Sequence, residues 1–564
     1  ILDLNGDGVK TTSKENGVYF DHENDGFAER TGWVSAEDGL LVYDRNNNGK
    51  IDNGTELFGD NTLLADGSKA ENGFEALKEF DSNKDGILDQ NDAQWHKLQI
   101  WQDKNQNGRT DAGELKSLDE TGVKSIDLNY SETQLTDSNN NAQKQTSTVT
   151  MADGSTANII DIWFDTHTVD SQQTNYIGVS DDAKALPEVY GFGKVYSLRQ
   201  AMSMDETGEL KSLVEQYVNF SYYTTVESET SGEETSDSSD NPEFSWGVVV
   251  PPIQVMKPNA EEERTQLLYD IIYHWAGVQD MPINGRDPTR TYGKVIDDTR
   301  KLEALEEFLG KDFLGTWCWG ERDPNPHGKA APYILRAFDM LATYVENQLL
   351  KQSDYKELLQ NISVSHNDTT NEDVIDINKM LPLLREKYNN NCSREDQLMA
   401  KFAQIIKEFE NGDSIIAAIR QQGSLTGTAF EQALAEFGDL KGTAGADKLI
   451  GTSGVDYING LAGNDTIYAA GGNDEINGGE GNDTIFAEDG DDTLIGGSGN
   501  DYLNGGNGAD TYIFEKGFGK DELDNSSEND EGGANNQDVI KFGEGILPEK
   551  TTLQRQNFDL IINV

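Results

Sequence analysis

Eight aspartates recur at a constant interval of nine residues toward the C-terminus of the chain. A glycine stands two residues before each of them, and a large apolar residue or tyrosine stands two residues after. Glycine allows the tight turns with positive φ that such a spacing requires. Carboxylate oxygens on these turns are hard donors with flexible geometry, which Ca²⁺ prefers. The spacing is that of the G-G-x-G-x-D-x-U-x repeat, which predicts a calcium-binding parallel β-roll. The candidate ligands are Asp447, Asp456, Asp465, Asp474, Asp483, Asp492, Asp501 and Asp510.

The elements that position these carboxylates must be short strands with one inward side chain each. The inward residues are Leu449, Ile458, Ile467, Ile476, Ile485, Leu494, Leu503 and Tyr512. Two repeats would make one coil, and stacked coils would bury a thin ladder. Because so small a core does not offset the entropy of ordering many glycines, bound ions must supply folding free energy. We expect an array that is disordered without calcium and rigid with it, whereas a flexible glycine-rich linker would show no such register.

A second set of candidate calcium ligands lies in the N-terminal region. The segment DKNQNGRTDAGE (103–114) matches the whole EF-hand loop pattern, with acids, amides and a glycine at the required places. Its arginine would contribute a backbone carbonyl, and its final glutamate would close the shell with both oxygens. The predicted ligands are Asp103, Asn105, Asn107, Arg109, Asp111 and Glu114.

Four further loops repeat this pattern less completely. The loop at 81–92 ends on aspartate, which is shorter than glutamate. Glu56 comes one residue late for the loop at 44–56, and Lys14 takes the closing position of the loop that begins DLNGDG (3–8). The loop at 21–26 is looser still. The candidate ligands are Asp3, Asn5, Asp7, Asp21, Glu23, Asp25, Asp44, Asn46, Asn48, Lys50, Asp52, Glu56, Asp81, Asn83, Asp85, Ile87, Asp89 and Asp92.

One such loop could be an ordinary turn, because Asn, Asp and Gly are good turn residues. Several in one region favour a calcium-binding module. The flanking segments 73–80 and 93–101 could supply short pairing helices, with Trp95, Leu98, Ile100 and Trp101 as core residues. His96 is a surface or packing residue in this interpretation, since calcium prefers oxygen.

The composition agrees with cation binding and excludes some partners. The chain of 564 residues has 102 acidic against 45 basic residues, a formal charge of −57. Such self-repulsion opposes folding unless cations, high salt or disorder relieve it. It argues against nucleic acid and anionic membrane surfaces as partners. Cys318 and Cys392 could form one bridge or stay thiols, but they provide no disulfide framework.

The sequence indicates a multidomain protein, with an α+β module that carries EF-hand-like calcium loops, a mostly helical middle domain and a C-terminal parallel β-roll. No apolar run reaches the length of a membrane span, and no signal-peptide pattern opens the sequence. A Ser-rich and acidic stretch at 226–244 has the composition of a linker or loop. The expected domains are the module (1–175), a connector (176–259), the helical domain (260–440), the repeat array (441–516) and a β-rich domain after it (517–564).

These features together resemble a known family. The repeats are similar to those of RTX (repeats-in-toxin) proteins, which type I systems secrete. The run from LDLNGDGVKT to GTELFG (2–59) resembles the self-processing module of RTX proteins of the FrpC/ApxIVA type. The segment ALPEVYGFGKVYSLRQAMS (185–203) and the tail at 538–564 resemble parts of the same group. The family therefore implies an extracellular or cell-surface location after export.

The resemblance implies a reaction. In such modules, calcium folding leads to cleavage of an Asp–Pro bond at the N-terminal border, through a cyclic anhydride. The anhydride is hydrolysed or acylates a lysine of another protein, which makes an isopeptide cross-link. No Asp–Pro pair precedes the first loop, so we expect this chain to be the downstream product, with no catalytic residue of its own. The pairs Asp287–Pro288 and Asp323–Pro324 are interpreted as turns.

Two functions remain open from the sequence. One is an autoprocessing RTX protein of the virulence type, with the upstream fragment of its precursor, lysines of other proteins, the type I secretion machinery and a host surface as partners. The other is a calcium-stiffened adhesin or scaffold whose loops are purely structural. A secreted hydrolase lacks its motif, since neither G-x-S-x-G nor H-E-x-x-H occurs. The stretch GTWCWGERDPNPHG (315–328) places Cys318, Asp323 and His327 close together, but no spacing supports catalysis there.

Overall fold

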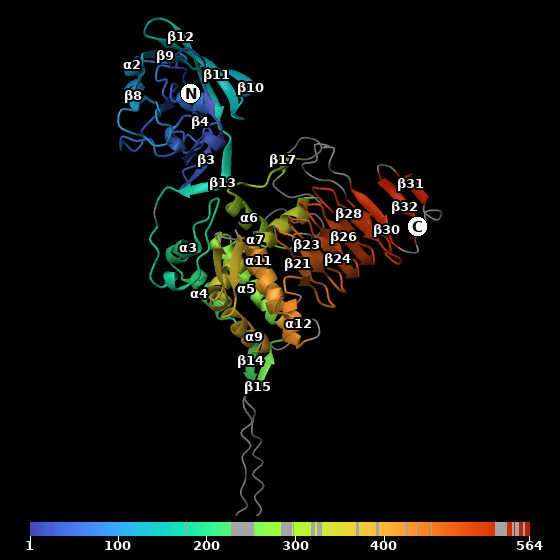
Figure 1. The fold of residues 1–564 in the computed structure, drawn as a ribbon. Helices are drawn as coiled ribbons and strands as arrows, with labels where there is room; N and C mark the ends of the chain where they lie inside the picture. Colours follow the sequence, from blue (N-terminus) through green and yellow to red (C-terminus); the bar gives the residue numbers. More distant parts are fainter. Residues whose placement is uncertain are drawn as a thin grey trace, which may run out of the picture. The chain divides into compact units, whose positions relative to one another are not determined.

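The chain folds into two compact units, Ile1–Ala342 and Thr343–Val564, with the boundary inside one long helix (Figure 1). The computed structural model describes residues 1–175, 177–226, 253–283, 296, 298–316, 322–323, 330–367, 372–390, 394–424, 427–435, 437–452, 454–524, 538–543, 546, 552–556 and 559–563. Outside these residues lie 227–244 of the predicted linker (226–244), both cysteines, His327 and the Asp287–Pro288 pair. Within the described helices, none is long and apolar enough to cross a membrane.

The N-terminal region of the first unit is built from short strands in small antiparallel sheets. One sheet has the order β10-β11-β9-β6, with β12 also paired to β11, and smaller sheets are β5-β7-β8, β13-β3-β2 and β1-β4. The strands are β1 (Thr11–Thr12), β2 (Val18–Phe20), β3 (Phe27–Thr31), β4 (Trp33–Val34), β5 (Leu40–Val42), β6 (Ile87–Asp89), β7 (Gln99–Trp101), β8 (Leu115–Ser117), β9 (Val123–Asp127), β10 (Ser131–Thr136), β11 (Ala142–Met151), β12 (Thr156–Trp163) and β13 (Thr166–Gln173).

Helices are few and short in this region. They are the α-helices α1 (Gly73–Leu77) and α2 (Leu118–Thr121) and the 3₁₀ turns Lys14–Asn16, Gly54–Glu56 and Trp95–Lys97. The segment 73–80 thus begins with the expected helix, but 93–101 forms a 3₁₀ turn followed by strand β7. The strand is favoured because β7 lies between β5 and β8, and this pairing buries Ile100 and Trp101 completely. Two apolar clusters, one around Phe74 and one around Trp33, hold the loops between the strands.

The remainder of the first unit is mainly helical. After the 3₁₀ turn Ala183–Ala185, the helices are α3 (Leu198–Met204), α4 (Glu209–Val218), α5 (Ala260–Trp275), α6 (Arg300–Leu309) and the start of α7 (Ala330–Gln352). Strand β14 (Tyr223–Val226) pairs with β15 (Ile253–Met256), and β16 (Gly315–Thr316) pairs with β17 (Arg322–Asp323). Trp275 packs edge-on against Phe308 at 4.9 Å between ring centroids. Phe338 of α7 is fully buried.

The second unit begins with helices around an apolar core. These are the end of α7, α8 (Lys356–Gln360), α9 (Met380–Asn390), α10 (Glu395–Lys407), α11 (Gly412–Arg420) and α12 (Ala429–Ala435), with the hairpin β18 (Ser363–Asn367), β19 (Glu372–Asp376). Phe402 of α10 is fully buried and stacks on Tyr355 at 5.4 Å. The predicted helical middle domain is therefore confirmed as a fold.

The C-terminal array forms a parallel β-roll of two facing sheets (Figure 1). One sheet contains β20 (Leu440–Lys441), β22 (Tyr457–Asn459), β24 (Glu475–Glu480), β26 (Thr493–Ser498), β28 (Thr511–Phe514) and β30 (Val539–Phe542). The other contains β21 (Lys448–Ile450), β23 (Thr466–Tyr468), β25 (Thr484–Phe486), β27 (Tyr502–Asn504) and β29 (Glu522–Leu523). A separate hairpin, β31 (Thr552–Gln556) and β32 (Asp559–Asn563), comes after the roll.

The strand register of the roll follows from the nine-residue period. Each strand pairs with the strand two repeats later, so that Ile458 lies beside Ile476 and Leu449 beside Ile467. All eight predicted inward residues are buried, and they make up most of one apolar cluster. The predicted roll, with one large side chain per repeat in a thin core, is confirmed.

Glycine is required where one coil lies against the next. A Cβ on Gly481 would stand 1.5 Å from the carbonyl oxygen of Gly463, and Gly481 has a φ of +135°. Gly445 occupies the same place in the first repeat, where no coil precedes it. The nearest atom to a Cβ on Gly445 is 3.8 Å away.

Gly481→Ala is expected to destabilise the calcium-loaded roll by at least about 2 kcal/mol, because the coils must separate to admit the methyl group. Gly445→Ala is expected to stay within about 0.5 kcal/mol of the wild type. Denaturant unfolding of the full chain at saturating calcium measures both values. Equal effects of the two substitutions would contradict the stacking explanation.

Candidate calcium sites

From the third repeat on, each repeat aspartate of the roll uses one carboxylate oxygen to join successive coils. The Oδ1 atom of Asp474 accepts the backbone N–H of Asp456 at 2.8 Å, and Oδ1 of Asp492 accepts that of Asp474 at 2.7 Å. The same bond recurs along both edges, with Asp465, Asp483, Asp501 and Asp510 as acceptors. The carboxylates therefore form two ladders, each with an 18-residue interval, along the edges of the roll.

The second oxygen of most of these carboxylates is buried without a hydrogen-bond partner in the described structure. An orphaned buried oxygen costs free energy unless a cation binds it. In the first two repeats, Thr443 and Thr452 instead donate a hydroxyl and an amide to the Oδ2 atoms of Asp447 and Asp456. The unpartnered atoms are Oδ2 of Asp465, Asp474, Asp483, Asp492, Asp501, Asp510 and Asp521.

Burial and neighbouring carboxylates raise the pKa of these aspartates above the ordinary value of 3.8. Desolvation is the largest cause in each, and the pKa reaches about 7 for Asp474 and Asp492 and about 6 for Asp483 and Asp510. A divalent cation would satisfy the orphaned oxygens and remove the electrostatic penalty. The residues present therefore fit calcium, which would be held by these Oδ2 atoms together with turn carbonyls.

Two ladder aspartates lie outside the nine-residue period. Asp521 accepts the N–H of Asp501 at 3.0 Å, and Asp538 accepts that of Asp510 at 2.9 Å. The period alone missed both residues. A detectable signal was present, since Leu523 and Ile540 each stand two residues after the aspartate, as in every repeat. The calcium-site geometry thus continues into the segment after the array.

A lysine ends one ladder at its first coil. The ammonium of Lys407, at the end of α10, contacts Oδ1 of Asp456, and both side chains are almost completely buried. Asp456 is the first aspartate of its ladder, so no earlier coil within the array supplies an N–H to that oxygen. Helix α10 therefore provides a fixed cation where the roll begins.

The five N-terminal loops share one backbone conformation. Their fourth residues all have a left-handed φ between 55° and 78°, and these are Gly6, Asn24, Asn47, Lys84 and Gln106. Their sixth residues are glycines with positive φ, namely Gly8, Gly26, Gly49, Gly86 and Gly108. In each loop the first aspartate accepts backbone N–H groups from within the loop, and these aspartates are Asp3, Asp21, Asp44, Asp81 and Asp103.

Three of these loops are closed by a carboxylate in the same way. In the loop at 103–114, the two oxygens of Glu114 accept the N–H of the second and ninth loop residues at 3.1 and 2.9 Å. Asp92 makes the same pair of bonds despite its shorter side chain, at 2.8 and 2.9 Å. Glu56 does so as well, at 3.0 and 2.8 Å, although it stands one residue late. The 3₁₀ turn Gly54–Glu56 takes up the extra residue.

The loop at 21–26 already holds an internal cation. The ammonium of Lys194 lies 2.7 Å from Glu23 and 3.4 Å from Asp25. These are the third and fifth loop residues, which were predicted as metal ligands. A side-chain cation therefore occupies the carboxylates of this loop, and it ties the loop to the segment that follows β13.

The N-terminal donors fit calcium by their chemistry rather than by clustered acids. Among the described residues, no group of three or more His, Cys, Asp or Glu side chains is arranged to hold a metal. In the loop at 103–114, the amide groups of Asn105 and Asn107 donate to Asp111 at 2.8 and 2.9 Å. EF-hand ligation draws on amide and backbone oxygens as well as acids, and the loop carries this donor set. Calcium binding by these loops stays a prediction.

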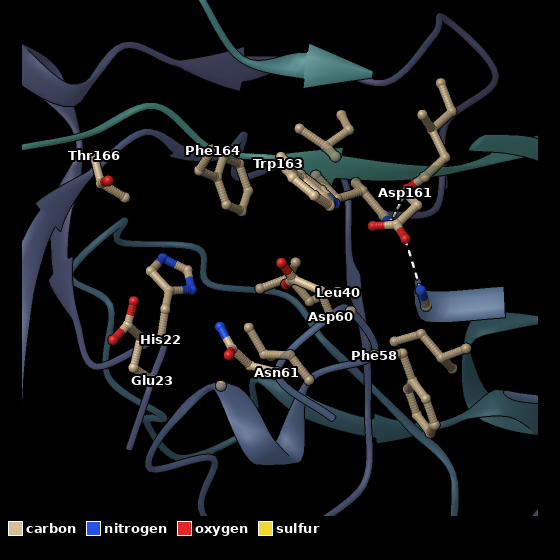
Figure 2. Close-up of a pocket in the computed structure, with 18 of the residues that line it drawn as sticks. His22, Glu23, Leu40, Phe58, Asp60, Asn61, Asp161, Trp163, Phe164 and Thr166 are labelled. Atoms are coloured by element: carbon tan, nitrogen blue, oxygen red, sulfur yellow. Dashed lines mark hydrogen bonds between the residues drawn. The ribbon is translucent and has the colours of Figure 1, made fainter. Parts of the chain in front are cut away.

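A cavity of about 240 Å³ opens beside the first residue of the chain. Figure 2 shows Asp161, Trp163 and Phe164 along one of its walls, with His22 and Asp60 among the facing residues. Asp161 accepts the N–H of Gly73 at 2.7 Å, and burial raises its pKa. Burial also lowers the pKa of His22 to about 4, so its imidazole is neutral at pH 7.

Two parts of the chain match known domain families. Residues 1–165 match the SPM domain, and residues 441–476 and 477–512 match the RTX calcium-binding nonapeptide repeat. Over 218 residues, 38% of the chain, the sequence is 42% identical to the iron-regulated protein FrpA of Neisseria meningitidis serogroup C. That match spans 19% of FrpA, so the chain covers about a fifth of its relative's length.

A similarity to a solved structure is weaker. It joins 21% of this chain to 35% of the extracellular lipase LipA from Serratia marcescens, at 20% identity and a TM-score of 0.10, which is too low to carry an argument. The resemblance found in the sequence is confirmed by the two domain matches and by FrpA. The chain is an RTX calcium-binding repeat protein related to FrpA, with an SPM domain at its N-terminal end.

In chelator, acidification from pH 7.5 to pH 5 is expected to increase the order of the roll. A carboxyl whose pKa rises on folding stabilises the fold fully below its unfolded value, near 3.8, and this contribution disappears as the pH rises through 6 to 7. Hydrogen exchange of residues 465–514 measures the effect. In calcium the trend should reverse, because protons compete with the ion, and a loss of order on acidification in chelator would contradict the prediction.

Glu56→Gln and Glu114→Gln are expected to weaken calcium binding equally, each in its own loop, because both side chains close their loops through the same pair of bonds. A loss of about tenfold in affinity is expected for each. Calcium titration followed by hydrogen exchange of residues 44–56 and 103–114 separates the loops. The control is Glu71→Gln, an exposed acid outside the loops. An unchanged loop at 44–56 in Glu56→Gln would refute its closure.

Proposed function

We propose that this chain is the calcium-folded part of a secreted RTX protein whose N-terminal module promotes cleavage of an Asp–Pro bond upstream of Ile1. The released carboxyl group then forms an isopeptide cross-link with a lysine. The observation that carries the proposal is the match of residues 1–165 to the SPM domain, together with the place of the first residues in the fold. Calcium is the trigger of this proposed reaction.

The first residues form the border at which such a cleavage would occur. Leu2 bridges Gly39 on one side and Ile159 of β12 on the other, both antiparallel. The nitrogen of Ile1 donates to the carbonyl of Ile160 at 2.7 Å. The N-terminal strand is thus fixed by backbone bonds on both sides, and a bond just before it would be held in a defined orientation, which is the main requirement of an intramolecular attack.

In the proposed reaction, the antiparallel register would direct an upstream segment toward the cavity of Figure 2. Leu2 lies opposite Ile159 and Ile1 opposite Ile160, so a preceding residue would lie opposite Asp161. Continued pairing would carry the segment along β12 past Trp163 and Phe164, which line the cavity. A buried wall would exclude water from the reacting bond and so favour transfer to an amine over hydrolysis.

The proposed chemistry needs no external nucleophile. The side-chain carboxylate of the upstream aspartate attacks its own main-chain carbonyl carbon, which forms a C–O bond. The C–N bond to proline breaks, and the prolyl nitrogen takes up a proton. Water opens the resulting cyclic anhydride to two carboxyl groups, or a lysine amine opens it to one amide and one carboxyl group. Positioning and charge stabilisation supply the rate enhancement.

Calcium would also restrict the reaction to the outside of the cell. Extracellular calcium modules bind at roughly 10⁻⁴–10⁻³ M, above the calcium level of a bacterial cytosol. The chain would then pass a type I secretion channel unfolded and fold on emergence, because its buried carboxylates repel one another without the ion. A virulence role, with a host surface and other proteins' lysines as partners, is suggested by the family resemblance.

The alternative function is a calcium-stiffened adhesin or scaffold without processing. The roll is compatible with it, since a rigid ion-loaded solenoid is a suitable spacer whether or not cleavage occurs. Both functions require calcium-dependent folding, but only the first predicts a covalent change upstream of Ile1.

A chain extended upstream with an Asp–Pro pair is expected to cleave at that bond when millimolar calcium is added, and to form high-mass adducts. Denaturing electrophoresis and mass spectrometry of the new termini measure both products. The matched control carries Asn–Pro at the same place, which removes the attacking carboxylate and should stay intact. An Asp–Pro chain that folds in calcium but remains uncleaved would favour the scaffold.

A further inference from the structure

The loop at 3–8 has the backbone of the other loops but no closing carboxylate in its own sequence. Its twelfth residue is Lys14, whose ammonium pairs with Asp165 at 3.0 Å. Its first residue, Asp3, nevertheless accepts N–H groups of Gly6 and Gly8 at 2.7 and 2.9 Å, as in the loops that are closed. A carboxylate from elsewhere in the chain is therefore needed to complete a calcium site here.

Strand pairing brings such a carboxylate to the loop. Leu2 and Gly39 exchange two backbone hydrogen bonds, of 2.8 and 3.1 Å. In this antiparallel register, the next residue pair is Asp3 and Asp38. Both side chains are buried, at 4% and 0% exposure. Two like charges directly opposite one another in a buried ladder are destabilising, so this pair calls for a cation.

Asp38 accepts a backbone N–H from the first loop, much as the closing carboxylates of the other loops accept N–H groups from their own loops. Its Oδ2 accepts the backbone N–H of Lys10, the eighth residue counted from Asp3, at 2.8 Å, and the hydroxyl of Ser35 at 2.9 Å. Its Oδ1 is buried without a hydrogen-bond partner in the described structure. Glu56, Asp92 and Glu114 each accept loop N–H groups in a comparable way.

The positive groups of the region are directed elsewhere. Lys10 extends its ammonium to Asp7 at 2.6 Å and lies 3.9 Å from Glu37, at the surface. The nitrogen of Ile1 donates its hydrogen bond to the carbonyl of Ile160 at 2.7 Å. Within the described part of the chain, no lysine or arginine forms an ion pair with Asp3 or Asp38.

We propose that Asp38 is the closing ligand of a calcium site in the first loop, so that this site is assembled from two segments of the chain. Asp3, Asn5 and Asp7 would supply the remaining side-chain oxygens. The ion would fasten the N-terminal strand to the turn that precedes β5, next to the border of the module. The inference rests on the proposed calcium-dependent folding of the module, and it extends that folding to the residues nearest the proposed cleavage point.

Hydrogen exchange of the full chain, with calcium and with chelator, tests this proposal at the level of single segments. In the wild type, calcium is expected to protect residues 1–10 and 35–42. In Asp38→Asn this protection should be lost or need about tenfold more calcium, while residues 103–114 and the roll remain protected. Asp38→Glu, which keeps a carboxylate, should recover part of the protection.

The control is Glu71→Gln, which makes the same charge change on an exposed side chain outside the loops and should leave the protection intact. Thermal unfolding in chelator separates ligation from a structural role. Without calcium, Asp38→Asn should be as stable as the wild type or more so, because one of two opposed charges is gone.

Equal destabilisation of Asp38→Asn with and without calcium would overturn the proposal, and so would full protection of residues 1–10 in that variant. A wild-type module that gains no protection from calcium anywhere in residues 1–175 would overturn the proposed function as well. Protection of the other loops but not of residues 1–10 would overturn the inference alone.

Discussion

The burial of carboxylates that lack a counter-charge is the constraint on which the rest of this structure depends. In the roll, seven aspartate oxygens are shielded from water and have no hydrogen-bond partner in the described residues. Such groups raise the free energy of the fold at neutral pH, as their elevated pKa values indicate. The thin ladder of aliphatic side chains beside them cannot offset that cost together with the chain entropy of so many glycines. A bound divalent cation would ligate the same carboxylates and remove this cost.

The protein meets this electrostatic requirement in more than one way. Lys407 is fixed by helix α10 against the first aspartate of one ladder, and Lys194 lies against two carboxylates of the loop at 21–26. These lysines are part of the chain, so the contacts they make do not depend on the calcium concentration. The other carboxylates require an exchangeable ion. The fold thus combines fixed junctions with segments whose order is expected to respond to calcium, and this difference separates structural contacts from candidate switches.

The same local motif is completed by different groups, some from its own loop and some from distant parts of the chain. All five N-terminal loops have left-handed fourth and sixth residues, so their backbones are equivalent before any ion is considered. The loops differ in the group that completes each of them: a carboxylate from the loop's own end, a lysine from the segment after β13, or Asp38 across a strand pair. The module is stabilised by these closures and by two small apolar clusters, rather than by one large core.

The sequence by itself determined the β-roll, its eight repeat aspartates and the eight side chains that point into its core. It could do so because the nine-residue period is local, and each repeat carries the same residue types at the same positions. It also determined the loop backbones, since Asp, Asn and Gly at fixed places select the turn. It did not determine the closure by Asp38, the lysine contacts or the ladder places of Asp521 and Asp538. Those depend on strand register and on helix packing between residues far apart in the chain. Only the tertiary structure brings such residues together, because pairing partners are chosen by burial and hydrogen bonding across the whole fold and leave no periodic trace in the sequence.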